Sequence, residues 1–254
     1  FRVWSLVIWR TLQGRLQWIL MDHERSEREL SWWCRRFGIT PVMIQDRDGG
    51  LWRNQNGRAW VDPYLPAVWE YNLDVAVRAA QLGFDEIQFD YVRFPSDGVT
   101  GQARYWKTDH SSATAIAAVG DFLRYARHRL AGTGAVISAA VFGLTTTSSG
   151  GMGIGQRLPD MAASVERLSP MMYPSHYAKG VYGIDNPDRD PYRTIAFGLR
   201  DARRKLGEDS YKLTPYLQDF SLQSEYGNAE LLAQIRAARE QGVESWILWN
   251  PLNR

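Results

Sequence analysis

The stretch that decides the fold reads Gly83-Phe84-Asp85-Glu86-Ile87-Gln88-Phe89-Asp90-Tyr91-Val92-Arg93-Phe94-Pro95-Ser96-Asp97. Apolar Ile87 and Phe89 alternate with polar neighbours, which is the period-two pattern of a strand. The strand stops on a carboxylate, and an arginine and a proline follow it. Asp90 and Arg93 therefore fall at or beyond its carboxyl end, where a parallel α/β barrel carries its catalytic side chains.

Strand and helix patterns alternate through the rest of the chain. The predicted strands span residues 85–91, 135–142, 169–173, 213–219 and 245–250, and the predicted helices span 68–82, 112–130, 158–168, 192–206 and 228–241. Gly83 is predicted to close the first helix, and Ser112 to cap the second. Successive units of roughly 30 to 50 residues favour a parallel sheet and an α/β fold of the (β/α)8 TIM-barrel type.

The amino-terminal part does not follow this pattern. Residues 1–40 are rich in tryptophan and arginine, and they show no clear strand that ends in a functional-looking residue. The first 84 residues hardly have room for three strand-and-helix units. We therefore expect an atypical segment at residues 1–44, which is truncated, divergent or mistranslated, and a barrel domain at residues 45–254.

Composition limits the classes of function. The net charge is only +2, and basic and acidic residues are interspersed, so no nucleic-acid partner is expected. Arg2, Arg10 and Arg15 interrupt the apolar start of the chain, which argues against a membrane span. The 11 Trp and 12 Tyr slightly favour a carbohydrate ligand, because flat aromatic rings bind sugars.

Metal and cofactor signatures are missing from the sequence. Cys34 is the one cysteine, which excludes an internal disulfide and a Cys-rich zinc site. The glycine-rich run at residues 151–155 lacks the spacing of a dinucleotide or phosphate site. No metal and no cofactor are expected. The sequence leaves oligomeric state and localisation open, with a secreted or cell-envelope parent as one reading.

Several segments, taken in order, resemble a bacterial protein family whose members are named as glycoside hydrolases. These members share a domain of unknown function numbered 4015 (DUF4015). The similar segments are residues 46–53, 59–64, 83–98, 141–146, 152–156, 169–177, 217–220 and 249–251. The resemblance covers about residue 45 to the carboxyl terminus. It implies a TIM barrel related to the α-amylase-like hydrolases, in which the five predicted strands are strands four to eight.

One position departs from this family. Its members usually carry an acidic residue where this chain has Ala140, directly before Val141-Phe142-Gly143. If that acid is catalytic in the family, this chain has lost it.

Glycoside hydrolysis usually needs two carboxyl groups, and Asp90 and Asp219 are the best pair. Strands four and seven lie on opposite sides of a barrel mouth, so their terminal side chains can face each other across a sugar. Arg93 is expected to keep Asp90 ionised as a nucleophile or stabilising group. Asp219 lies between apolar residues and suits the general acid, although a loop-capping role is nearly as well supported.

Other polar and aromatic residues follow the predicted strands. Trp249 and Tyr91 are candidate platforms for a pyranose ring, and core filling accounts for either ring at least as well. His176 lies in a Pro-Ser-His-Tyr loop, where packing is the commoner role. The predicted substrate-binding residues are Tyr91, Arg93, Gln156, Tyr173, His176, Gln218, Trp249 and Asn250.

The leading hypothesis is a glycoside hydrolase that cleaves a polysaccharide with this carboxylate pair. A second hypothesis is a catalytically impaired glycan-binding barrel, suggested by Ala140 and by the atypical amino terminus. A third, weaker one is a barrel enzyme that acts on a sugar derivative as a deacetylase or lyase. The expected partner in each case is a carbohydrate.

Overall fold

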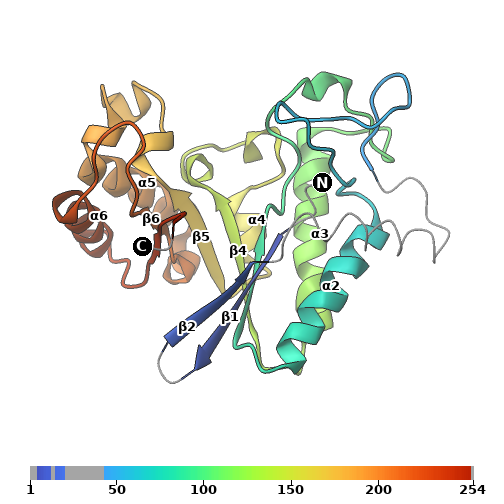
Figure 1. The fold of residues 1–254 in the computed structure, drawn as a ribbon, viewed down its shortest axis with the longest axis horizontal. Coiled ribbons are helices and arrows are strands. Elements are labelled where there is room, and N and C mark those ends of the chain that lie inside the picture. The colour runs from blue at the N-terminus through green and yellow to red at the C-terminus, as the bar shows by residue number, and fades with distance from the viewer. Residues whose placement is uncertain (1–4, 13–14, 21–42, 253–254) are drawn as a thin grey trace. The chain divides into compact units, whose positions relative to one another are not determined.

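The computed structural model describes residues 5–12, 15–20 and 43–252, and it forms two compact units (Figure 1). Unit 1 comprises Phe1–Ala139 and Gly150–Gln156, and unit 2 comprises Ala140–Ser149 and Arg157–Arg254. Much of the predicted amino-terminal segment lies outside the described residues.

Strands and helices alternate in both units, which confirms the predicted α/β class. The strands are β1 (Ser5–Leu12), β2 (Arg15–Leu20), β3 (Glu86–Asp90), β4 (Val136–Phe142), β5 (Arg167–Met172), β6 (Tyr216–Gln218) and β7 (Ile247–Trp249). The helices are α2 (Pro66–Gln81), α3 (Ser112–Leu130), α4 (Leu158–Ala162), α5 (Pro191–Leu206) and α6 (Asn228–Glu240). All five predicted strands and all five predicted helices are present.

The strands of unit 1 have the order β2-β1-β3, followed by the part of β4 up to Ala139. β3 and β4 are parallel, with Glu86 opposite Val136, as expected for successive barrel strands. β1 and β2 form an antiparallel pair, and β1 is also antiparallel to β3, with Ser5 opposite Asp90. The sequence analysis did not predict these two strands, but both end on leucine, Leu12 and Leu20, as expected for a region without a strand that ends in a functional-looking residue.

Within its described residues, unit 1 has the α-helices α2 and α3, which pack against each other (Figure 1). The Tyr125 hydroxyl donates to Glu70 Oε1 at 2.5 Å across this contact. The predicted cap of α3 was wrong by one residue, since Ser111 rather than Ser112 accepts the N–H of Thr114. The backbone N–H of Ser111 donates in turn to Thr114 Oγ1 at 2.9 Å, and this reciprocal pair is a capping box.

Unit 2 contains the parallel strands β5, β6 and β7, and its helices α5 and α6 pack against each other. Its core includes Met172, Leu199 and Leu217, all fully buried. The helix predicted at 158–168 was too long, because α4 ends at Ala162 and β5 starts at Arg167. A turn fits between them, in which Ser164 N donates to Met161 O.

Candidate active site

The strand β3 ends at Asp90, which is half-buried. Its Oδ1 accepts a hydrogen bond from the backbone N–H of Tyr91 at 2.7 Å. Tyr91 has a φ of +54°, in the left-handed region, which costs a residue with a side chain about 1–2 kcal/mol. Such strain gathers at functional sites, so it marks the end of β3, and Met152 and Tyr182 share this conformation in later loops.

Arg93 lies in the loop after Asp90 and is only 3% exposed. Its Nη1 donates to the carbonyl of Phe94 at 2.8 Å. Its guanidinium carbon lies 4.9 Å from the ring centroid of Trp60 and 5.3 Å from that of Tyr91. Arg93 thus holds the loop in place from within, and its contact with a substrate stays a prediction.

Gln156 also supports the loop after β3. Its side chain is 1% exposed, and its Nε2 donates to the carbonyl of Val92 at 3.2 Å. Phe94 N donates to the carbonyl of Ile154 at 2.9 Å, so the segment around Gln156 follows the same loop. The amide of Gln156 serves the backbone here, and its binding of a sugar hydroxyl stays a prediction.

In unit 2, the carboxyl ends of β6 and β7 meet at Asp219. Asp219 N donates to the carbonyl of Trp249 at 3.0 Å, and Asn250 Nδ2 donates to the carbonyl of Asp219 at 2.5 Å. The rings of Trp249 and Tyr216 are 6.0 Å apart in an edge-to-face arrangement. The side chain of Asn250 therefore fixes the backbone that carries Asp219.

Gln218 precedes Asp219 and is fully buried. Its Oε1 accepts from the N–H of Ser175 at 3.0 Å and from its Oγ at 2.8 Å. Gln218 N donates to Gln234 Oε1 at 2.9 Å. The residue ties the end of β6 to the loop after β5 and to α6, which leaves its binding of substrate a prediction.

His176 lies in the loop after β5. Its Nδ1 is 3.0 Å from Ser175 Oγ, and its ring centroid lies 5.4 Å from that of Tyr173 and 6.1 Å from that of Phe220. Partial burial lowers the pKa of His176, and the nearby charge of Asp188 opposes this shift. His176 is therefore favoured in its neutral form, which can donate or accept a hydrogen bond.

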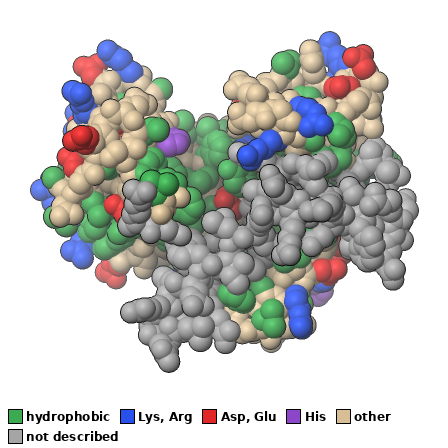
Figure 2. Space-filling model, in the orientation of Figure 1, with side chains coloured by type: hydrophobic (Ala, Val, Ile, Leu, Met, Phe, Trp, Pro, Cys, Tyr) green, Lys and Arg blue, Asp and Glu red, His purple; other side chains and the backbone are tan. Residues whose placement is uncertain are grey.

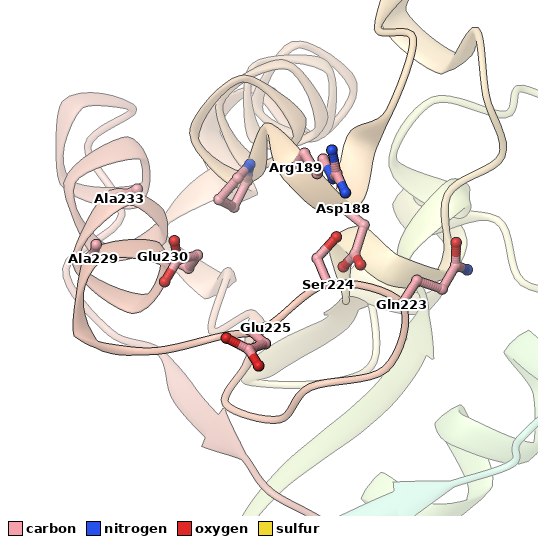
Figure 3. A pocket seen from close by; sticks show the side chains of 9 residues that line it. Asp188, Arg189, Gln223, Ser224, Glu225, Ala229, Glu230 and Ala233 are labelled. Carbon is pink, nitrogen blue, oxygen red and sulfur yellow. The ribbon is translucent and has the colours of Figure 1, made fainter.

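The sequence did not single out Asp188, which is 3% exposed. Its Oδ1 accepts from Gln218 Nε2 at 3.4 Å, and its carbonyl accepts from the Tyr226 hydroxyl at 3.0 Å. Asp188 borders an open hollow of about 570 Å³, which Arg189, Ser224, Glu225 and Glu230 also line. Figure 3 shows Asp188 and Ser224 on one side of the hollow and Glu230 on α6 opposite them.

No local pattern could have found Asp188. It stands between two capping residues, Asn186 and Asp190, in a run of polar residues and prolines that indicates only a turn. Its significance comes from Gln218, which lies thirty positions further along the chain.

The predicted site residues fall into two groups. Unit 1 brings together Asp90, Tyr91, Arg93 and Gln156, and unit 2 brings together Tyr173, His176, Gln218, Asp219, Trp249 and Asn250. Asp90 and Asp219 belong to different units, so their pairing stays a prediction.

Surface and metal-ligand patterns add little to this picture. On the face drawn in Figure 2, basic side chains lie among acidic ones on each unit. Among the side chains of residues 43–252, no three His, Cys, Asp or Glu are grouped to hold a metal ion. No helix in the described part of the chain has the length and apolar character needed to cross a membrane.

A comparison with known protein families shows to which family the chain belongs. A family model described as a putative glycosyl hydrolase domain, DUF4015, matches residues 40–254. The chain belongs to the DUF4015 family. The predicted resemblance is thereby confirmed. A search of curated protein sequences found no significant match to the DUF4015 chain.

Two solved structures share the fold of the DUF4015 chain. The PgaB (BpsB) glycoside hydrolase domain from Bordetella bronchiseptica aligns with 82% of it, at 15% identity and a TM-score of 0.59. The spore cortex-lytic enzyme SleL from Bacillus megaterium QM B1551 aligns with 74% of it, at 13% identity and a TM-score of 0.50. The DUF4015 chain spans 64% of the PgaB domain structure and 51% of the SleL structure.

These similarities confirm the predicted fold class, a partial (β/α)8 barrel of the kind found in glycoside hydrolases. The family description points to a glycosidase-like function, and the similarity to the two solved structures shows the fold alone.

Proposed function

We propose that the chain is a glycoside hydrolase that cleaves a glycosidic bond of a polysaccharide, with Asp90 and Asp219 as its two carboxyl groups. The observation that supports this proposal most is the backbone geometry at the end of β3, in a chain that belongs to a glycosyl hydrolase family. There the Asp90 carboxylate is oriented by the N–H of Tyr91, in a left-handed backbone conformation that costs free energy.

The two carboxyl groups take different roles in this proposal. One group attacks or stabilises the anomeric carbon while the other protonates the leaving oxygen. Asp90 accepts a backbone N–H, which suits an ionised nucleophile or stabilising group. Asp219 is half-buried beside Trp249 and Asn250 and is the proposed general acid.

Release of reducing ends from soluble polysaccharides tests the proposal. Asp90→Asn and Asp219→Asn should each lower the rate by about 10²–10⁴-fold, the usual contribution of a positioned acid or base. Asp185→Asn is the matched control, because the Asp185 side chain is 96% exposed. Full hydrolysis by Asp90→Asn would show that Asp90 is not catalytic.

The second candidate function is glycan binding without turnover, and Ala140 favours it. Ala140 lies on β4, is 2% exposed, and stands where the resemblance to the family leads us to expect an acid. A methyl group cannot transfer a proton or attack a sugar. In this case the chain should bind a polysaccharide and release no reducing ends, so measurable turnover by the chain would exclude it.

A further inference from the structure

Trp106 differs from the other tryptophans between residues 43 and 252, because it alone is exposed there, at 70%. Tryptophan is highly buried on average, so an exposed ring calls for an explanation. Trp106 lies in the loop that joins β3 to α3, and this loop starts at the strand end that bears Asp90. In barrel enzymes, loops that follow strands build the active site.

The backbone beneath the Trp106 ring is fixed by a buried carboxylate. Trp106 N donates to Asp62 Oδ2 at 2.6 Å, and Tyr64 N donates to Asp62 Oδ1 at 3.0 Å. Asp62 is 1% exposed, and burial raises its pKa against the effect of these two hydrogen bonds. Burying a carboxylate costs free energy. Here the two hydrogen bonds of Asp62 fix the backbone of Trp106, whose ring is exposed.

The residue before Trp106 is fixed as well. The ring of Tyr105 packs against those of His110, Phe94 and Tyr64, with centroids 4.2, 5.4 and 5.8 Å away. Tyr105 also packs on the cluster of Ile44, Trp52, Trp60 and Ala103, and Tyr91 packs on the same cluster. Trp106 is therefore displayed by a rigid loop that shares its packing with the residue next to Asp90.

Charged residues follow Trp106 in the same loop. Lys107 Nζ and Asp109 Oδ1 form an exposed ion pair at 3.0 Å. A single flat ring beside charged groups suits a pyranose, which has an apolar C–H face and an edge of hydroxyl groups. A docked protein usually needs a contiguous apolar patch of several hundred Å² instead.

We propose that Trp106 is a stacking platform for one sugar ring of a polysaccharide, at a binding position beside Asp90. This inference rests on the proposed function, because it assumes that the glycan of the hydrolytic site also covers Trp106. Trp106 does not take part in the bond cleavage. It increases the affinity for a longer glycan.

Affinity electrophoresis through native gels tests this proposal, with soluble starch, xylan, mixed-linkage β-glucan or glycol chitin as the probe. The protein carries Asp90→Asn, which preserves the polysaccharide during the run. In the gel that slows this protein most, Trp106→Ala should weaken binding about tenfold, the change expected when roughly 55 Å² of stacked apolar surface is lost. Trp106→Phe should restore part of the affinity, since it keeps a flat ring.

Tyr211→Ala is the matched control. Tyr211 is 78% exposed, but it lies on the segment that enters β6, at the amino end of that strand. Its removal should leave binding unchanged, and circular dichroism checks that each variant folds. The proposal is wrong if none of the four gels slows the protein, or if Trp106→Ala binds as tightly as its parent. Failure of the proposed function appears separately, as full hydrolysis by the Asp90→Asn protein.

Discussion

Replacement of Gln218 tests whether one buried amide organises the candidate site of unit 2. Its Oε1 accepts both hydrogen bonds from Ser175, at 3.0 and 2.8 Å, and its Nε2 donates to the Phe220 carbonyl at 3.0 Å. A longer contact of 3.4 Å joins Nε2 to Asp188 Oδ1. The side chain is fully buried, so water cannot replace these partners.

Gln218→Met keeps the volume of the side chain and removes all four contacts. A hydrogen bond contributes about 1 kcal/mol net, and a buried group left without a partner costs more. Since Ser175 Oγ retains His176 as a partner, we expect a loss of about 3–4 kcal/mol. For a domain of this size, this lowers the melting temperature by roughly 10 °C.

Gln218→Glu has the same shape but exchanges the donor for a second carboxyl group that faces Asp188. Burial and this like charge raise the pKa of the new acid above its usual value. Above that raised pKa the variant buries a charge and loses stability, whereas below it the protonated acid can donate as Nε2 did. Its stability relative to Gln218→Met should therefore rise as the pH falls from 7 to 5.

Urea and thermal denaturation followed by circular dichroism measure both effects. Gln81→Glu on α2 is the control, because Gln81 is exposed. The reasoning is refuted if Gln218→Met is within about 0.5 kcal/mol of the parent, the usual range for a surface substitution. A Gln218→Glu variant whose deficit does not depend on pH would also refute it.

Four further substitutions test local features. Gly155→Ala should lower the free energy of unfolding by about 3 kcal/mol, because φ is +84° and the new Cβ would lie 2.7 Å from the Ala115 carbonyl oxygen. Gly153→Ala is its control and should lower it by about 1 kcal/mol, because the space around Gly153 is open. Urea denaturation measures both. Lys205→Met should cost about 2 kcal/mol by the same measurement, since Nζ donates to two backbone carbonyls. Burial lowers the pKa of His176, so below pH 6.5 the unfolded chain binds more protons than the folded one and the parent protein loses stability. His176→Gln removes this group and should reduce that loss.

The elements from residue 66 onward could be predicted because their signals are local. An apolar period, a closing glycine such as Gly83 and a capping serine lie within one or two turns of the element that they define. The boundaries were less accurate, as at α4, because tertiary pairing decides where β5 begins. The hairpin of β1 and β2 was missed because its pairing with β3 joins segments about 80 residues apart.

The candidate site was less predictable than the fold. Asp90 and Asp219 could be proposed because both lie at strand ends, and strand ends are visible in the sequence. Neither the left-handed backbone of Tyr91 nor the exposure of Trp106 follows from its local sequence. Both depend on packing against distant segments, and a single sequence does not report such contacts.

Several features that cost stability lie in loops that follow strands. Tyr91 and Tyr182 adopt left-handed conformations after β3 and β5, and the buried carboxylate of Asp188 lies in the same loop as Tyr182. Glycine at either tyrosine position would relieve the strain, so stability alone does not account for the residues present. The amino ends of the same strands carry no left-handed residue other than glycine within residues 43–252. This asymmetry supports the prediction of a site at the carboxyl ends of the strands on energetic grounds, without reference to the family.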